Sequence, residues 1–182
     1  MLGALFSLVL LLTPALHAQA AKPASARKGY IEADVRFMQG MIGHHGQAVR
    51  MTAMVLSHTE NPELRLLAEK IDVSQRDEMA SMRRWLRVRG EAIPDSAVHH
   101  HELMPGMLSD EELAALDRAR GTEFDRQFLN FMIRHHEGAL TMVERLFATA
   151  GAAQEPELAG FANDVDADQR AEIRRMRALL SY

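Results

Sequence analysis

Two pairs of adjacent histidines are the residues of this sequence best suited to chemistry. His44-His45 and His135-His136 each complete a Met-Ile-x-His-His motif, and an alanine and a methionine follow each pair at the same spacing. Neutral imidazole and thioether donors together favour a soft ion, Cu(I) above all, with Ag(I) as its mimic. Thioethers form no disulfides, so such a site suits an oxidising compartment. The methionines in register with the two pairs are Met41, Met51, Met132 and Met142.

The composition excludes several other kinds of chemistry. The 182 residues include nine histidines and twelve methionines but no cysteine, which rules out disulfides, thiolate cages, iron–sulfur clusters and cysteine nucleophiles. A net charge of −4 and 5% aromatic residues do not fit a nucleic-acid-binding surface. No Glu-x-x-His, His-Glu-x-x-His, P-loop or Gly-x-Ser-x-Gly sequence occurs, so bundle di-iron sites, zincins and serine hydrolases lack support.

The chain repeats itself. The segment from Asp34 to Met51 matches that from Asp125 to Met142, and residues 62–82 match residues 156–176. Uncommon residues, the histidine pairs and several methionines, fall in register. Two such units favour a duplication within one pseudo-symmetric domain rather than a solenoid, which needs more repeats.

Each repeat reads as a helical hairpin. Apolar residues recur at helical spacing, and the starts are marked by Asn61-Pro62, by a Ser109-x-x-Glu112 capping box and by Glu155-Pro156. The sequence therefore predicts an all-α four-helix bundle built from two duplicated hairpins. The expected helices run from about Ile31 to His58, from Pro62 to Gly90, from a Thr122 cap to about Ala150, and from Pro156 to the C-terminus, with repeat one at 31–90, a linker at 91–108 and repeat two at 109–182.

Four polar residues lie on the otherwise apolar inner stripes of the second and fourth long helices. Burying them without partners is costly, so we expect imidazole N–H groups to be their partners and the histidines to be oriented by them. The carboxylates also allow a harder ion, Cu(II) or Zn(II), to bind directly. These residues are Gln75, Glu78, Gln169 and Glu172.

Other histidines and methionines have less specific interpretations. Met38, Met54 and Met79 fit core packing, and His58 fits a favourable charge at a helix end. The linker carries His99, His100 and His101 and a Met104-Pro-Gly-Met107 turn. This set suits either the capture and transfer of metal or a plain polar loop.

The first twenty residues resemble a secretion signal. An apolar run from Leu2 to Leu12 precedes Ala18-Gln19-Ala20, so we expect cleavage after Ala20, a flexible stretch at 21–30 and the bundle at 31–182. The run is short for a membrane anchor, although an uncleaved tether is the alternative. The prediction is an exported protein, periplasmic or secreted, with no stable membrane insertion after cleavage.

The doubled Met-Ile-x-His-His motif, with Asp34 or Asp125 upstream and the Met104-Pro-Gly-Met107-Leu turn between the copies, resembles the domain-of-unknown-function 305 (DUF305) family. The resemblance covers about residues 30–180. It implies a ferritin-like bundle in an exported bacterial protein, and members of its CopM type are secreted copper-binding proteins that support copper resistance. Carried over residue by residue, it implies ligand roles for His44, His45, His135, His136, Met41, Met51, Met132, Met142, Met104 and Met107.

The leading hypothesis is an exported protein that binds copper, most readily Cu(I), for sequestration, resistance or transfer. A copper transporter or chaperone is the partner class that fits. No residue is assigned a catalytic role. The alternatives are a metal-dependent redox enzyme that uses the inward histidines and glutamates, and a helical interaction domain.

Overall fold

The computed structural model describes residues 29–95 and 104–181. Within these ranges the chain is helical and contains no strand. The predicted signal peptide and His99, His100 and His101 lie outside the described residues. The helices are α1 (Glu32–Thr52), α2 (Val55–His58), α3 (Pro62–Val88), α4 (Asp110–Arg118), α5 (Gly121–Ala148) and α6 (Pro156–Leu180).

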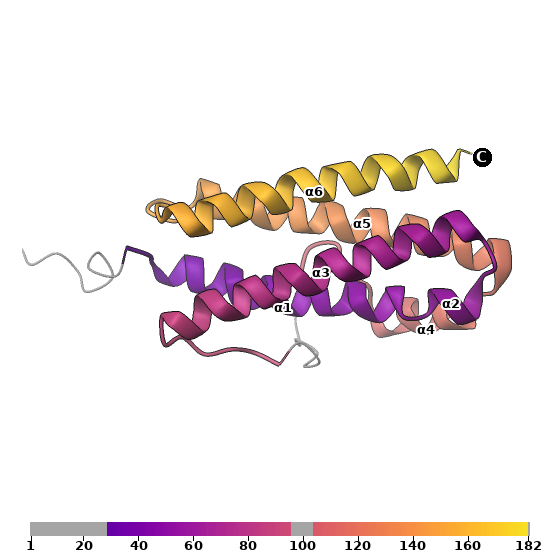
Figure 1. Ribbon diagram of the computed structural model, residues 1–182, viewed down its shortest axis with the longest axis horizontal. Helices are drawn as coiled ribbons and strands as arrows, with labels where there is room; N and C mark the ends of the chain where they lie inside the picture. Colours follow the sequence, from indigo (N-terminus) through magenta and orange to yellow (C-terminus); the bar gives the residue numbers. More distant parts are fainter. Residues whose placement is uncertain (1–28, 96–103, 182) are drawn as a thin grey trace, which may run out of the picture.

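Four long helices form the bundle that the sequence predicts. The chain runs out along α1 and returns along α3, and α5 and α6 form a second antiparallel hairpin (Figure 1). The two hairpins meet mainly through α1 and α5, while α4 packs on α5. Both copies of the histidine motif are therefore on the two helices that join the hairpins.

The first long helix is shorter than predicted. The helix expected to reach His58 ends at Thr52, and after a turn at Ala53 and Met54 the short helix α2 follows. Thr52 Oγ1 donates to the carbonyl of Val49 at 2.9 Å, an interaction that bends helices. It also contacts Asp72 Oδ1 on α3 at 3.0 Å, so the break is tied to the neighbouring helix.

Helix starts follow the sequence signals at three of four places. Asn61 accepts from the amides of Glu63 and Leu64 with proline in the first turn, and Ser109 forms the predicted capping box with Glu112. Glu155-Pro156 likewise precedes α6. The predicted Thr122 cap is wrong, because α5 already begins at Gly121, and the N-cap position is occupied by Arg120 in extended conformation.

The repeated aspartates hold the ends of the hairpins together. Asp34 at the start of α1 accepts from the backbone amide of Ala153, just before α6, at 2.8 Å. Its counterpart Asp125 in α5 accepts from the side-chain amide of Asn61, just before α3, at 3.0 Å. Each repeat thus fastens its first helix to the other repeat's connection by the same residue type.

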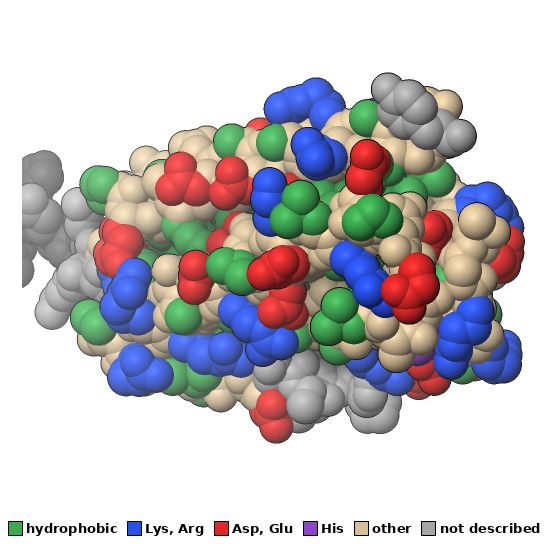
Figure 2. All heavy atoms as spheres, turned by 45° about the vertical axis from the view of Figure 1, so that its right-hand side comes forward, with side chains coloured by type: hydrophobic (Ala, Val, Ile, Leu, Met, Phe, Trp, Pro, Cys, Tyr) green, Lys and Arg blue, Asp and Glu red, His purple; other side chains and the backbone are tan. Residues whose placement is uncertain are grey.

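The hydrophobic core consists of two clusters, separated along α1 by the histidines. The first core cluster includes Met51, Val55, Phe124, Met132 and Met176. The second core cluster includes Phe37, Met41, Met82, Trp85 and Val143. The outer surface is mixed, with acidic and basic side chains interspersed on the face drawn in Figure 2. In the described part of the chain no helix is both long and apolar enough to cross a membrane.

Candidate metal centre

The four motif histidines come together between the two core clusters. Each side chain is at most 1% exposed, which is unusual for so polar a group. The rings of His44 on α1 and His135 on α5 stack with centroids 3.8 Å apart and planes 38° apart. His45 and His136 lie 6.4 and 6.2 Å from their sequence neighbours' rings. The duplication therefore produces one layer of four imidazoles.

Backbone carbonyls hold the inner pair. His44 Nε2 donates to the carbonyl of Pro105 at 3.0 Å, and His135 Nε2 donates to the carbonyl of His44 at 3.0 Å. A carbonyl oxygen only accepts hydrogen bonds, so the ring proton of each histidine is on Nε2. In both rings Nδ1 is left with the lone pair.

Carboxylates hold the outer pair, as the sequence predicts for these glutamates. His45 Nε2 contacts Glu78 Oε2 on α3, and His136 Nε2 contacts Glu172 Oε2 on α6 at 2.6 Å. An ionised carboxylate likewise accepts the Nε2 proton and fixes the tautomer. In all four histidines Nε2 thus makes the hydrogen bond to the protein and Nδ1 does not.

Three of the four Nδ1 atoms lack a partner among the described residues. Nine buried side-chain nitrogen or oxygen atoms of the described residues lack a hydrogen bond, and three are Nδ1 of His44, His45 and His136. Burial without a partner costs about 1–3 kcal/mol per group, so native proteins keep few such atoms. Their concentration in one layer is the arrangement expected where a ligand supplies the missing partner.

Burial also keeps the inner pair neutral. Desolvation, aided by the neighbouring His45, lowers the pKa of His44 to about 3. Desolvation and then the charge of His44 lower the pKa of His135 well below its usual value. Protons therefore compete weakly for the Nδ1 lone pairs of these two residues at neutral and mildly acidic pH.

The glutamines behave differently from the glutamates. Gln75 and Gln169 are each 1% exposed. Both amide atoms of Gln75 and the Oε1 of Gln169 lack a partner, so the expectation that imidazole N–H groups satisfy them is wrong. The physical reason is that each imidazole has one proton, and a carbonyl or a glutamate already accepts it. The glutamines add three more unpartnered atoms to the same part of the core.

The predicted methionine ligands divide into buried and partly exposed groups. Met41, Met51 and Met132 are fully buried, whereas Met142, Met104 and Met107 are half-buried. Met104 Sδ and Met142 Cε both lie beside Gly40 on α1: a Cβ at that residue would be 3.3 Å from the sulfur and 3.6 Å from the methyl carbon. The linker turn therefore brings Met104 to the same place as Met142.

We call residues 104–108 the strap. Its turn is closed by the amide of Met107 donating to the carbonyl of Met104 at 3.1 Å. At the apex Gly106 adopts a φ of +77°, and a Cβ on Gly138 of α5 would be 1.9 Å from the Pro105 carbonyl oxygen. The strap thus lies directly on the α5 backbone, which only glycine permits at both positions.

Gln47 is a functional residue that the sequence reasoning missed. Its side-chain amide donates to the carbonyl of Leu108 at 3.0 Å and accepts from the Leu108 amide at 2.7 Å. Together with His44 it fastens the strap to α1. The available signal was its place two residues after the first histidine pair, on the inward side of the helix.

A metal ion bound at this layer would need sulfur donors in addition to the imidazole nitrogens. Among residues 29–95 and 104–181, no three His, Asp or Glu side chains converge in a geometry that would hold a metal ion. The unpartnered Nδ1 atoms provide nitrogen donors, and the buried thioethers on either side of the layer are the remaining soft donors. This donor set fits Cu(I) or Ag(I) better than an ion that prefers oxygen.

His58 lies in the last turn of α2, as the helix-end interpretation expects, and it also makes tertiary contacts. Its ring is buried and packs 4.9 Å from that of Phe124. Its Nε2 donates to the carbonyl of Asp117 at 2.9 Å, and its Nδ1 lies 2.8 Å from the Ser57 hydroxyl. His58 therefore connects α2 to α4, away from the four-histidine layer.

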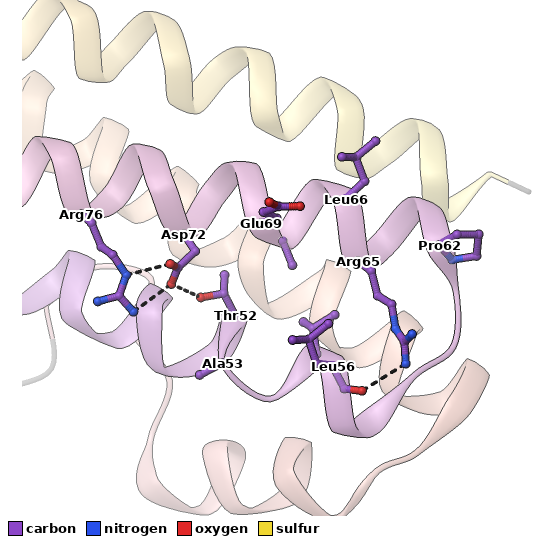
Figure 3. Close-up of a pocket in the computed structure, with 11 residues that line it drawn as sticks. Thr52, Ala53, Leu56, Pro62, Arg65, Leu66, Glu69, Asp72 and Arg76 are labelled. Carbon is purple, nitrogen blue, oxygen red and sulfur yellow. Dashed lines mark hydrogen bonds and ion pairs between the residues drawn. The ribbon is translucent and has the colours of Figure 1, made fainter.

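A surface cavity of about 720 Å³ lies between the α1–α2 turn and α3. Figure 3 shows Arg76, Asp72 and Thr52 linked along one side and Arg65 donating to the carbonyl of Leu56. None of the predicted metal ligands lines this cavity. It is separate from the histidine layer.

Comparison with known proteins supplies the family. The model of the family described as "Domain of unknown function (DUF305)" matches residues 34–180, nearly all of the described bundle. The chain belongs to the DUF305 family. A DUF305 fragment from Deinococcus radiodurans has the same fold, with 34% identity, a TM-score of 0.74, and coverage of 84% of this chain and 97% of that one.

The solved structures similar to this chain also include CopM. Its Cu(II)-bound form is 31% identical to this chain, with a TM-score of 0.67 and coverage of 80% and 94% of the two chains. Its Cu(I)-bound form is 30% identical, with a TM-score of 0.65 and coverage of 81% and 95%. An uncharacterised mimivirus protein, L153, is 35% identical over 49 residues, which are 27% of this chain and about a third (32%) of that relative.

Proposed function

We propose that this protein binds copper outside the cytoplasm, most readily as Cu(I), and sequesters or transfers it. The observation that carries the proposal is the layer of four buried histidines in which Nδ1 of His44, His45 and His136 is unpartnered while every Nε2 is held. Such an arrangement fixes the donor atoms before the ion arrives, which reduces the cost of ordering them on binding.

Two further observations support copper over other ions. The chain has no cysteine, so buried thioethers are its soft donors, and they pack on both sides of the layer. CopM, which is 30–31% identical to this chain and of similar structure, has been solved in Cu(I)-, Cu(II)- and Ag-bound forms. The apolar leader predicted for residues 1–20 supports the export part of the proposal.

An anaerobic Cu(I) competition titration of residues 21–182 tests this function. The parent should bind tightly, and a variant with His44, His45, His135 and His136 changed to alanine should lose that binding. His58→Ala is the matched control, because His58 is also buried but lies outside the layer, so its copper affinity should equal that of the parent.

The possible results separate the hypotheses. Equal binding by the parent and the four-histidine variant would contradict a site in the bundle and point to the linker. Absence of binding by the parent would contradict the copper proposal altogether. Steady oxidation of Cu(I) or consumption of peroxide by the loaded protein would favour the redox enzyme instead.

A further inference from the structure

The methionines of the bundle fall into two equivalent sets, one on each side of the histidine layer. Met41 and Met82 belong to the second core cluster, and Met142 packs against it. Their counterparts in the other repeat, Met132 and Met176, belong to the first core cluster together with Met51. The sets are Met41, Met82 and Met142, and Met132, Met176 and Met51.

The register of the hairpins places two members of each set opposite each other. In the antiparallel pair α1 and α3, His45 contacts Glu78 and Thr52 contacts Asp72. Met82 is one turn beyond Glu78 and Met41 is one turn before His45, so the two lie at the same level of the bundle. Both are fully buried.

The same reasoning applies to the second hairpin. His136 contacts Glu172 across the antiparallel pair α5 and α6. Met176 is one turn beyond Glu172, and Met132 is one turn before His136. Both are fully buried, and they lie on the opposite side of the histidine layer from Met41 and Met82.

The third member of each set comes from the other hairpin. Met142 of α5 lies beside Gly40 of α1: its methyl carbon would be 3.6 Å from a Cβ on Gly40. Gly40 directly precedes Met41 in the chain. Met51 of α1 shares the first core cluster with Met132 of α5. Each set therefore draws on three helices: two members lie one turn from the histidine layer, and the third, Met142 or Met51, is six residues beyond the histidine pair of its own helix.

We infer that the protein has two soft-metal sites, one per set, each with three thioethers and an adjacent imidazole Nδ1, and that Met82 and Met176 are ligands. This inference rests on the proposed function and gives it a stoichiometry and two ligands that the histidine motifs do not contain. Three thioethers with one imidazole suit Cu(I) and Ag(I).

The test uses Ag(I), which undergoes no redox change, with native mass spectrometry and competition titration. Met82→Leu and Met176→Leu should each bind one tight Ag(I) fewer than the parent, and the double variant two fewer. Leucine conserves volume, so the fold is kept, which circular dichroism verifies. Met79→Leu is the matched control, because Met79 is buried on the same helix outside both sets, and it should bind as many ions as the parent.

A second readout separates ligation from packing. With ¹³C-labelled methionine methyl groups, Ag(I) should shift the resonances of Met82 and Met176 and leave that of Met79 unmoved. An unchanged ion count in both single variants, or unshifted Met82 and Met176 signals in the loaded parent, would overturn the inference. Such a result would leave the proposed function standing if Cu(I) binding still required the four histidines.

Discussion

Replacing Gly138 by alanine should displace the strap from the metal centre. A Cβ at Gly138 would lie 1.9 Å from the carbonyl oxygen of Pro105 and 2.4 Å from its carbonyl carbon. Atoms this close cannot coexist, and the neighbour is backbone, so either the strap or α5 must move by more than an ångström. The carbonyl that would shift is the one that accepts from His44 Nε2.

The cost can be worked from the contacts that the strap makes. Moving it weakens the His44 hydrogen bond and the two bonds between Gln47 and Leu108, each worth about 0.5–1.5 kcal/mol net. Partial relaxation keeps some of them, and overpacking adds about 1–3 kcal/mol. We expect Gly138→Ala to lower the free energy of unfolding by about 2–4 kcal/mol relative to a helical Gly→Ala change without a clash.

Gly160→Ala provides that reference. Gly160 is exposed within α6, and a Cβ there would meet nothing within 4 Å. Alanine should stabilise this helix by up to about 1 kcal/mol. Urea unfolding followed by circular dichroism measures both variants. If Gly138→Ala unfolds at the same urea concentration as Gly160→Ala, the close approach of the strap to α5 is refuted.

Two further predictions concern the metal-free protein. Burial lowers the pKa of His44 from 6.5 to about 3, so as the pH falls the unfolded chain binds a proton at this residue before the folded chain does. The free energy of unfolding is therefore highest above about pH 6.5 and decreases as the pH falls toward 3. Within that range His44 alone should lower the free energy of unfolding by about 1.4 kcal/mol per pH unit. Urea unfolding at pH 7.5, 6 and 5 would measure this change, and a free energy of unfolding that does not vary with pH would contradict it. Gln75→Leu should raise the free energy of unfolding by about 1–3 kcal/mol because it removes two unpartnered buried atoms, whereas Gln47→Leu should lower it because both its amide atoms are bonded; the same sign for both would contradict the assignment.

Most of the fold could be predicted because its signals are local. Helical periodicity and proline or serine at helix starts are properties of short segments, and they gave the four long helices and their order. The break after Thr52 could not be predicted, because it depends on the contact of Thr52 with Asp72, a tertiary interaction. The start of α5 at Gly121 was missed because Thr122 offered a good capping residue that the chain does not use.

The centre was predictable in its residues but not in its hydrogen bonds. Spacing placed the histidines and glutamates on inner faces, and the Glu78 and Glu172 contacts agree with it. Spacing alone did not show that Pro105 and the backbone of His44 would occupy the remaining Nε2 atoms. The unpartnered Gln75 follows from those bonds, since no imidazole proton is left for it.

Adjacent histidines explain why one duplication creates a complete layer. Neighbouring residues on a helix point about 100° apart, so His44 faces the other hairpin while His45 faces α3 of its own. The second copy does the same with His135 and His136. Four imidazoles therefore meet with no further change in sequence, and each pair obtains one partner within its hairpin and one across the interface.

The strap breaks the symmetry of this layer. Gly40 leaves space beside α1 that Met104 and Met142 fill, whereas the matching position in the second repeat is Phe131, which packs against the first core cluster. Because Met142 and Met104 are half-buried and Met51 and Met132 are fully buried, the two ends of the centre differ in access to solvent. In the proposed copper protein, an ion bound at the end beside Gly40 would therefore lie nearer to solvent than an ion bound at the opposite end.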